Sequence, residues 1–196
     1  MFSLLQRFQT VSNQAVTYAC LIAAFIALSS WLQLIQNDAF SVPAIVSNIK
    51  PTLNVRTSRY YGSQNGKPKQ NSKLAFDLEA DLERLFNWNT KQVFVYLTAE
   101  YNGSERPETK SEVTYWDKII TKKSDAHLSL HDIKSKYSVW DLEDKLEGRE
   151  LTFKLKWNIQ PRVGPLIYGE TVGNQTVILP NMKQSQKKKK PKQNST

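Results

Sequence analysis

The stretch LTFKLKWNI, residues Leu151 to Ile159, alternates between apolar and polar side chains at every position. Its apolar members are Leu151, Phe153, Leu155, Trp157 and Ile159, and its polar members are Thr152, Lys154, Lys156 and Asn158. Successive side chains of a β-strand point to opposite faces of the sheet. This period of two therefore predicts a strand with one face in a core and the other in solvent.

A second alternating run precedes it, Lys73 to Leu82, with Asp77, Glu79 and Asp81 on its polar face. Other segments are rich in the aromatic and β-branched residues that favour strands, namely Gln92–Tyr101, Val113–Ile120 and Thr176–Leu179. Turn signals separate these runs: Tyr61–Lys69, Asn102-Gly103, Glu147-Gly148 and Val163-Gly164-Pro165. Only Asp81–Phe86 and Val139–Leu146 are candidate short helices. We therefore predict a mainly β chain whose residues 36–182 form an antiparallel β-sandwich.

The N-terminal part of the chain has a different pattern. No charged residue occurs from Phe8 to Asn37, and the apolar centre of this stretch is Ala15 to Ile35. A helix of that length extends about 30 Å, which matches the hydrocarbon thickness of a bilayer. Tyr18 and Trp31 lie near its ends, as in an interfacial aromatic belt. We predict that residues 15–35 form a transmembrane helix that follows a short cytoplasmic segment, residues 1–14.

A cleaved secretory signal peptide is the alternative interpretation of this segment. Ala27-Leu28-Ser29-Ser30 offers the small residues of a cleavage site. The apolar run, however, is longer than a usual signal-peptide core and continues through Trp31 and Ile35 beyond that site. These features favour an uncleaved signal anchor, with the short N-terminus in the cytoplasm and the long C-terminal part across the membrane.

The basic character of the chain comes from its C-terminal tail. The formal charge is +9, and six lysines lie in residues 183–196, so the remainder carries +3. This tail has no core-forming residues and is expected to be disordered. Its KKKKPK run resembles a nucleic-acid patch, but an anchored protein with an extracytoplasmic tail would not present it to nucleic acid. We expect a lipid bilayer, and no nucleic acid, among its partners.

No pattern of residues indicates catalysis or a cofactor. Cys20 is the single cysteine, and the two histidines are His127 and His131. On a strand, these histidines and Ser129 share a solvated face, while Leu128 and Leu130 point inward. GxSxG, HExxH, GxGxxG and the P-loop pattern are all absent from the sequence. We therefore expect no catalytic residue, no metal site and no cofactor.

Three N-x-[S/T] sequons are candidate glycosylation sites if the C-terminal part lies outside the cytoplasm. They begin at Asn102, Asn174 and Asn194. Asn174 precedes a predicted strand in a turn and has a Thr sequon, whereas Asn102 has a Ser sequon in a hairpin turn. Asn194 lies too close to the chain end for good presentation. We expect occupancy in the order Asn174, Asn102, Asn194.

Several long stretches carry a family resemblance: Asp81–Tyr101, Val113–Ile120, Leu155–Pro161, and also Phe40–Gly62 and Tyr168–Gly173. They resemble the family of subunit 3 of the eukaryotic signal peptidase complex, in particular its fungal branch. The resemblance runs from the N-terminal helix to about residue 180. The lysine tail departs from it and inherits no role.

The resemblance implies a single-pass type II protein of the endoplasmic reticulum (ER) membrane with a lumenal β-sandwich. It implies a non-catalytic accessory subunit that supports signal-peptide removal by scaffolding the catalytic serine-peptidase subunit. The other small membrane subunits would be further partners, and nascent secretory chains would be indirect ones. Small residues on the helix would allow close packing with neighbouring helices: Ala19, Ala23, Ala24, Ala27 and Ser30.

Two alternatives from other functional classes remain open. A secreted or ER-resident ligand-binding β-sandwich glycoprotein would share the fold but would lose its N-terminus by signal-peptide cleavage. A membrane-tethered hydrolase would share the anchor, but it would process a substrate without any partner.

Overall fold

The structure is a computed structural model, and it describes residues 3–57, 68–103, 107–141, 143 and 145–181. A long helix α1 (Leu4–Gln36) is followed by nine strands within these residues. The strands are β1 (Ala44–Arg56), β2 (Lys69–Asp81), β3 (Thr90–Asn102), β4 (Lys110–Ile120), β5 (His127–Lys134), β6 (Val139–Trp140), β7 (Glu150–Pro161), β8 (Ile167–Glu170) and β9 (Gln175–Ile178). Short 3-10 turns occur at η1 (Ala39–Ser41), η3 (Glu83–Leu85) and η4 (Lys123–Asp125).

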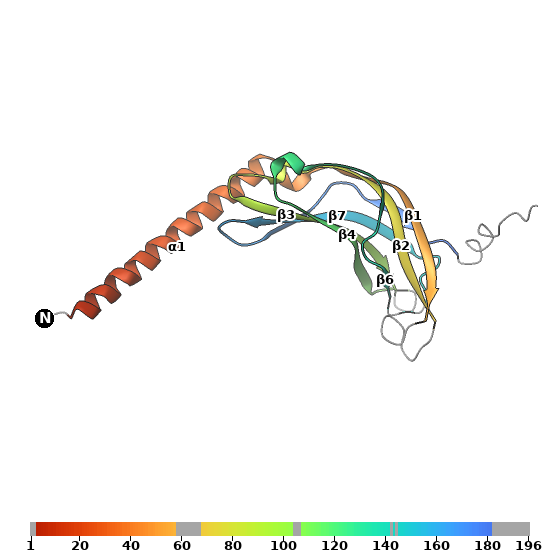
Figure 1. The fold of residues 1–196 in the computed structure, drawn as a ribbon, viewed down its shortest axis with the longest axis horizontal. Coiled ribbons are helices and arrows are strands. Elements are labelled where there is room, and N and C mark those ends of the chain that lie inside the picture. Colours follow the sequence, from red (N-terminus) through yellow and green to blue (C-terminus); the bar gives the residue numbers. More distant parts are fainter. Residues whose placement is uncertain (1–2, 58–67, 104–106, 142, 144, 182–196) are drawn as a thin grey trace, which may run out of the picture.

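The strands form two sheets that make up the sandwich. One sheet has the order β1-β2-β5, with β6 also paired to β2. The other has the order β4-β3-β7-β8, with β9 also paired to β7. Every pairing between these strands is antiparallel. Figure 1 shows the two layers side by side, with α1 projecting from one end. The predicted fold class, mainly β with one N-terminal helix, is confirmed.

The core lies between the two sheets, on the faces that the alternating patterns predicted. On β7, the five apolar side chains from Leu151 to Ile159 are each at most 1% exposed. On β2, Leu74, Phe76, Leu78 and Ala80 are buried as well, and Leu82 beyond its end is also buried. Burial of apolar area at about 25 cal/mol per Å² is the main favourable contribution to such a fold.

The helix is longer than the predicted span. It begins at Leu4, where the side chain of Ser3 accepts a hydrogen bond from the Gln6 backbone N–H. Its 33 residues correspond to a length of about 50 Å at 1.5 Å per residue. Among the described residues it is the one helix long and apolar enough to cross a membrane. Beyond its end, Asp38 adopts a left-handed conformation with φ 51°, which turns the chain toward β1.

The structure corrects one predicted element and leaves others open. The candidate helix Val139–Leu146 begins as a strand: Val139 and Trp140, a β-branched and an aromatic residue, form β6 against β2, and none of the other described residues of this segment is helical. Asp81–Phe86 contains only the single turn η3. Most of the predicted turn Tyr61–Lys69 lies outside the described residues, and Lys69 already begins β2. The tail, residues 183–196, also lies outside them.

Candidate functional site

One candidate functional feature is the contact between α1 and the sandwich. The side-chain amide of Asn87, in the loop between η3 and β3, donates to both the carbonyl oxygen and the hydroxyl of Ser30, at 3.1 and 2.9 Å. The amide oxygen of Asn87 accepts from the backbone N–H of Asn89 and from the hydroxyl of Thr90, both at 3.0 Å. Both ends of the Asn87 amide are therefore engaged, and they link the η3–β3 loop to α1.

Asn89 ties a second loop to the first. Its side chain is 2% exposed, donates to the carbonyl of Val163 at 2.8 Å and accepts from the N–H of Val163 at 3.1 Å. The backbone N–H of Arg162 also donates to the Asn89 carbonyl at 2.7 Å. The connection between β7 and β8 is therefore fixed beside the η3–β3 loop.

The β7–β8 connection also reaches the helix directly. Gly164 has φ +118°, and a β-carbon added there would lie 3.0 Å from the β-carbon of Ala27. Ser30 and Leu34, one helical turn apart, are buried at 3% and 0% exposure. In Figure 1 the β7–β8 hairpin runs beside the C-terminal part of α1. We call Ala27, Ser30, Asn87, Asn89, Val163 and Gly164 the helix–sandwich junction.

The junction changes the interpretation of the small helix residues. Ala27 and Ser30 were expected to pack against helices of other subunits, but in this chain they contact its own sandwich. Ala19 and Ala24 are exposed, and Ala23 is half-buried. Packing of a neighbouring helix against these three residues stays a prediction.

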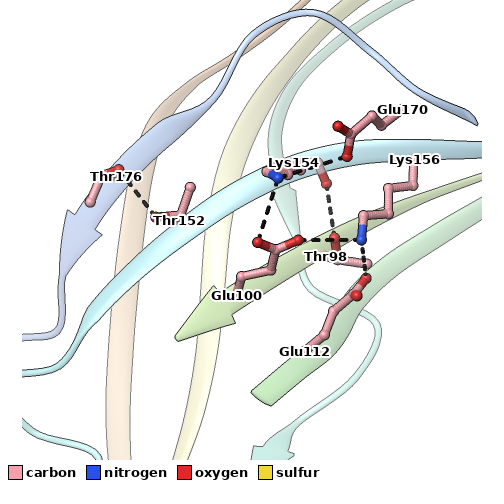
Figure 2. A network of polar contacts seen from close by, with 8 residues as sticks. All are labelled: Thr98, Glu100, Glu112, Thr152, Lys154, Lys156, Glu170 and Thr176. Atoms are coloured by element: carbon pink, nitrogen blue, oxygen red, sulfur yellow. Dashed lines mark hydrogen bonds and ion pairs between the residues drawn. The ribbon is translucent and has the colours of Figure 1, made fainter. Parts of the chain in front are cut away.

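A second candidate feature is the solvent-facing side of the five-stranded sheet. Figure 2 shows two lysines of β7 among three carboxylates of neighbouring strands. Lys156 donates to Glu112 at 2.7 Å and to Glu100 at 3.4 Å. Lys154 lies 3.5 Å from Glu100 and 3.8 Å from Glu170. These ion pairs join strands β3, β4, β7 and β8 across one face.

The pKa values on this face follow from the opposing effects of burial and charge. Burial alone would raise the pKa of Glu100, but the hydrogen bond from Lys156 and the charges of Lys154 and Lys156 lower it below its ordinary value. Burial alone would lower the pKa of Lys156, but its bonds to Glu112 and Glu100 raise it. Glu100 and Lys156 are therefore both charged near neutral pH.

The same face carries apolar and aromatic side chains beside the ion pairs. The rings of Phe94 and Tyr96 stack with centroids 5.3 Å apart. Ile119, opposite Phe94 on β4, is 53% exposed, and Tyr168 on β8 is 63% exposed. Exposed aromatic residues bordered by charged ones are typical of protein interfaces. We call Phe94, Tyr96, Ile119, Tyr168 and the five charged residues above the outer sheet face.

The residues singled out from the sequence lie apart from these two features. His127, Ser129 and His131 are exposed on β5, whereas Leu128 is buried, as the alternation predicted. Within the described part of the chain, no three His, Cys, Asp or Glu residues are grouped so that they could hold a metal ion.

The candidate glycosylation sites do not cluster. Asn174 is exposed immediately before β9, and Asn102 is exposed at the end of β3, where it pairs with Lys110. The chain from Gly103 to Thr109 connects β3 to β4, so this connection is longer than a two-residue hairpin turn. Asn194 lies outside the described residues.

Sequence reasoning missed the junction. The local signal was present in Asn87-Trp88-Asn89, because asparagine side chains often bond to nearby backbone groups in loops. The same reasoning could not have paired Asn87 with Ser30, which is 57 positions away.

Comparison with known proteins gives consistent matches along almost the whole chain. A family model described as "Signal peptidase subunit" matches residues 1–182. A signal peptidase complex subunit 3 of Saccharomyces cerevisiae is 60% identical over 182 residues, which is 92% of this chain and 98% of the relative. The subunit 3 of Yarrowia lipolytica is 46% identical over 171 residues, 86% of this chain and 92% of the relative. The human subunit 3 is 40% identical over 120 residues, 58% of this chain and 64% of the relative.

Proposed function

The chain belongs to the family of signal peptidase complex subunit 3, and from this membership we propose that it is a non-catalytic subunit that supports signal-peptide removal at the ER membrane. The observation that carries the proposal is the 60% identity to the yeast subunit over 98% of that protein's length, anchor helix included. The matches give no support to the alternative of a ligand-binding sandwich with a cleaved signal peptide.

The proposed topology is a single-pass type II arrangement. Residues 1–14 would be cytoplasmic, residues 15–35 would span the membrane, and the sandwich of residues 36–182 and the tail of residues 183–196 would be lumenal. The position of the one long apolar helix ahead of the sandwich supports this order. A short N-terminus before a long folding domain also favours the N-terminus in the cytoplasm.

The proposed mechanism is scaffolding. The helix–sandwich junction fixes the sandwich relative to its anchor, so a protein bound to the sandwich is held at a constant height above the bilayer. The bond to be cleaved after the signal peptide would emerge at the membrane surface. A catalytic domain held at that height would already be positioned beside it. Fixed placement of this kind reduces the entropic cost of bringing the reacting groups together.

We assign the outer sheet face to the catalytic serine-peptidase subunit. Its exposed Ile119 and Tyr168 and its half-buried Phe94 and Tyr96 offer apolar area, and its ion pairs offer a polar border. The other small membrane subunits would pack on Ala19, Ala23 and Ala24 of the helix. Nascent secretory chains would then meet this subunit only through the assembled complex.

Affinity capture of the tagged full-length chain from microsomes in mild detergent tests this assignment. The wild-type chain should bring down the catalytic subunit, identified by mass spectrometry. Joint substitution of Ile119→Ala and Tyr168→Ala should remove that subunit from the eluate. Val55→Ala, an exposed position on the opposite sheet, is the matched control and should retain it. Equal recovery with the double variant would contradict the assignment.

A further inference from the structure

The junction lies at a depth that the membrane should occupy. Ala27 and Ser30 belong to the apolar run Ala15 to Ile35. At 1.5 Å per residue, Ala27 precedes Ile35 by about 12 Å and Ser30 precedes it by about 8 Å along the helix. If that entire run were in hydrocarbon, the η3–β3 loop and the β7–β8 connection would be immersed with it.

The helix surface near its C-terminal end is covered by protein. Ser30 is 3% exposed and Leu34 is not exposed at all, so this face packs against the sandwich. The earlier helix differs, because Phe8, Leu21 and Phe25 are more than 60% exposed. The apolar side chains of the helix up to about Ala27 are therefore free to contact lipid. Beyond that point, the sandwich covers part of the helix surface.

The two loops at this depth present large apolar side chains. Trp88, between the two junction asparagines, is 56% exposed. Leu166, two residues beyond Gly164, is 48% exposed, and Trp31 on the adjoining helix turn is 44% exposed. Tryptophan is enriched at the boundary between hydrocarbon and headgroups, because its ring is apolar and its N–H is polar.

Several backbone N–H and carbonyl groups of these loops already have hydrogen-bond partners within the protein, so they do not need water. Asn89 satisfies both the N–H and the carbonyl of Val163, and its own carbonyl accepts from Arg162. Backbone groups that enter the hydrocarbon without partners carry a large free-energy cost. Asn89 removes that cost for both backbone groups of Val163 and for the N–H of Arg162 in the β7–β8 connection.

We infer that the loops bearing Trp88 and Leu166 are a lipid-contact surface, which inserts these two side chains into the bilayer interface on the sandwich side. The edge of the hydrocarbon then lies near Ala27 to Ser30 instead of at Ile35. The remaining helix, from Leu4 to Ser30, extends about 40 Å and is still long enough to cross the membrane. The last turns of α1, after Ser30, would then lie outside the hydrocarbon and pack against the sandwich.

This arrangement revises the span proposed above: hydrocarbon about 30 Å thick that ends near Ala27 to Ser30 would begin about 20 residues earlier, so residues 10–14 would enter the membrane and residues 31–35 would leave it. Two hydroxyl groups of this early segment are already paired within the helix. The side chains of Thr10 and Thr17 donate to the carbonyls of Gln6 and Asn13, each at 2.9 Å. The inference rests on the anchored helix of the proposed function, but it does not depend on the partner that the sandwich binds.

Fluorescent labels in the full-length chain, reconstituted in phosphatidylcholine vesicles, test the inference. Trp88→Cys and Leu166→Cys are each made in a Cys20→Ser background and labelled with the environment-sensitive dye NBD. Lipids that carry a nitroxide near the headgroup should quench most of the emission at both positions. Ile178→Cys, at an exposed position on the end of β9 distant from the junction, is the matched control and should lose little emission.

The native Cys20, labelled in the otherwise unchanged chain and probed with lipids that carry a nitroxide deep in the acyl chain, separates this inference from the proposed function, because Cys20 would lie about 10–15 Å inside the hydrocarbon. Quenching at Cys20 without quenching at 88 and 166 would overturn the lipid-contact surface while leaving the anchor intact. A blue-shifted but unquenched label at 88 would mean that protein covers the loop, which also overturns it. Absence of quenching at Cys20 would contradict the membrane anchor and the inference together.

Discussion

Gly169 of β8 lies directly against the indole of Trp157 on β7, so closely that a β-carbon at Gly169 would overlap atoms of the six-membered ring. Trp157 is completely buried. The centroid of its ring lies 5.7 Å from the ring centroid of Phe40, just beyond α1. Trp157 of β7 therefore contacts both the edge strand β8 and the turn η1 that follows α1.

Replacement of Trp157 by alanine should destabilise the domain by about 3–5 kcal/mol, because it leaves a cavity at this contact. Gly169→Ala should also destabilise it, because the added methyl group displaces the indole. Tyr168→Ala, at an exposed neighbouring position, should change stability by less than about 0.5 kcal/mol. Denaturant unfolding of the full-length chain in detergent measures all three. An unchanged transition for Gly169→Ala would contradict the described contact.

Asn87→Ala should loosen the helix relative to the sandwich. The substitution removes both hydrogen bonds to Ser30, and leaving buried polar groups unpaired costs about 1–3 kcal/mol. Spin labels at Cys20 and at Val55→Cys would report the distance between helix and sandwich. A narrow distribution should broaden in the Asn87→Ala chain. Gln92→Ala, which loses a bond only to Gln160 within the same sheet, should leave it narrow. Equal widths in all three chains would exclude a positioning role for Asn87.

Glu100 should make stability depend on pH in the acid range. Its pKa in the folded chain is lowered by Lys156 and Lys154 despite burial. A lowered carboxyl pKa stabilises the fold fully above the unfolded-state value and loses that contribution as the pH falls through the folded-state value. Glu100→Gln should therefore be less stable than wild type near neutral pH, by about 1 kcal/mol or less. The difference should shrink as the pH falls below the ordinary glutamate pKa and disappear below the lowered pKa of Glu100 in the folded chain. Thermal unfolding across this range measures it, and a difference that is independent of pH would be contrary to expectation.

The sequence predicted the strands that have one face in the core and the other in solvent. It missed strands in which this alternation is interrupted or too short to be recognised. On β7 and β2, alternation alone identified the buried side chains. The pattern fails on β1, where Pro51 interrupts the run and a register shift between Ser47 and Lys50 reverses the faces. Asn48, in this irregular segment, has φ 51°. On β8 only four residues are paired, too few for a period to be recognised.

The junction could not be predicted for a different reason. It is made of contacts between distant residues, such as Ser30 with Asn87, which no local pattern encodes. Val139–Leu146 is only a candidate short helix from the sequence, because apolar spacing is ambiguous over so short a run. Pairing of Val139 with Ser72 on β2 decided in favour of a strand.

Glycosylation of the expressed chain should follow the order Asn174, Asn102, Asn194. Asn174 and Asn102 are both exposed, and the Thr sequon of Asn174 makes it the better acceptor. Glycosidase treatment and peptide mapping of the chain purified from microsomes would give the occupancies. Full occupancy of Asn194 beside an unmodified Asn174 would reverse the expected order, and absence of any glycan would weaken the lumenal placement.

The measurement that tests the account most directly is the rate of signal-peptide cleavage by complexes purified through a variant of this chain. The variant carries His127→Ala, Ser129→Ala and His131→Ala together, at positions that are exposed on β5. Because the chain is proposed to support cleavage without catalysing it, the triple variant should fold, capture the catalytic subunit and cleave a preprotein at nearly the wild-type rate. A triple variant that folds and assembles normally, yet yields an inactive complex, would contradict the central claim.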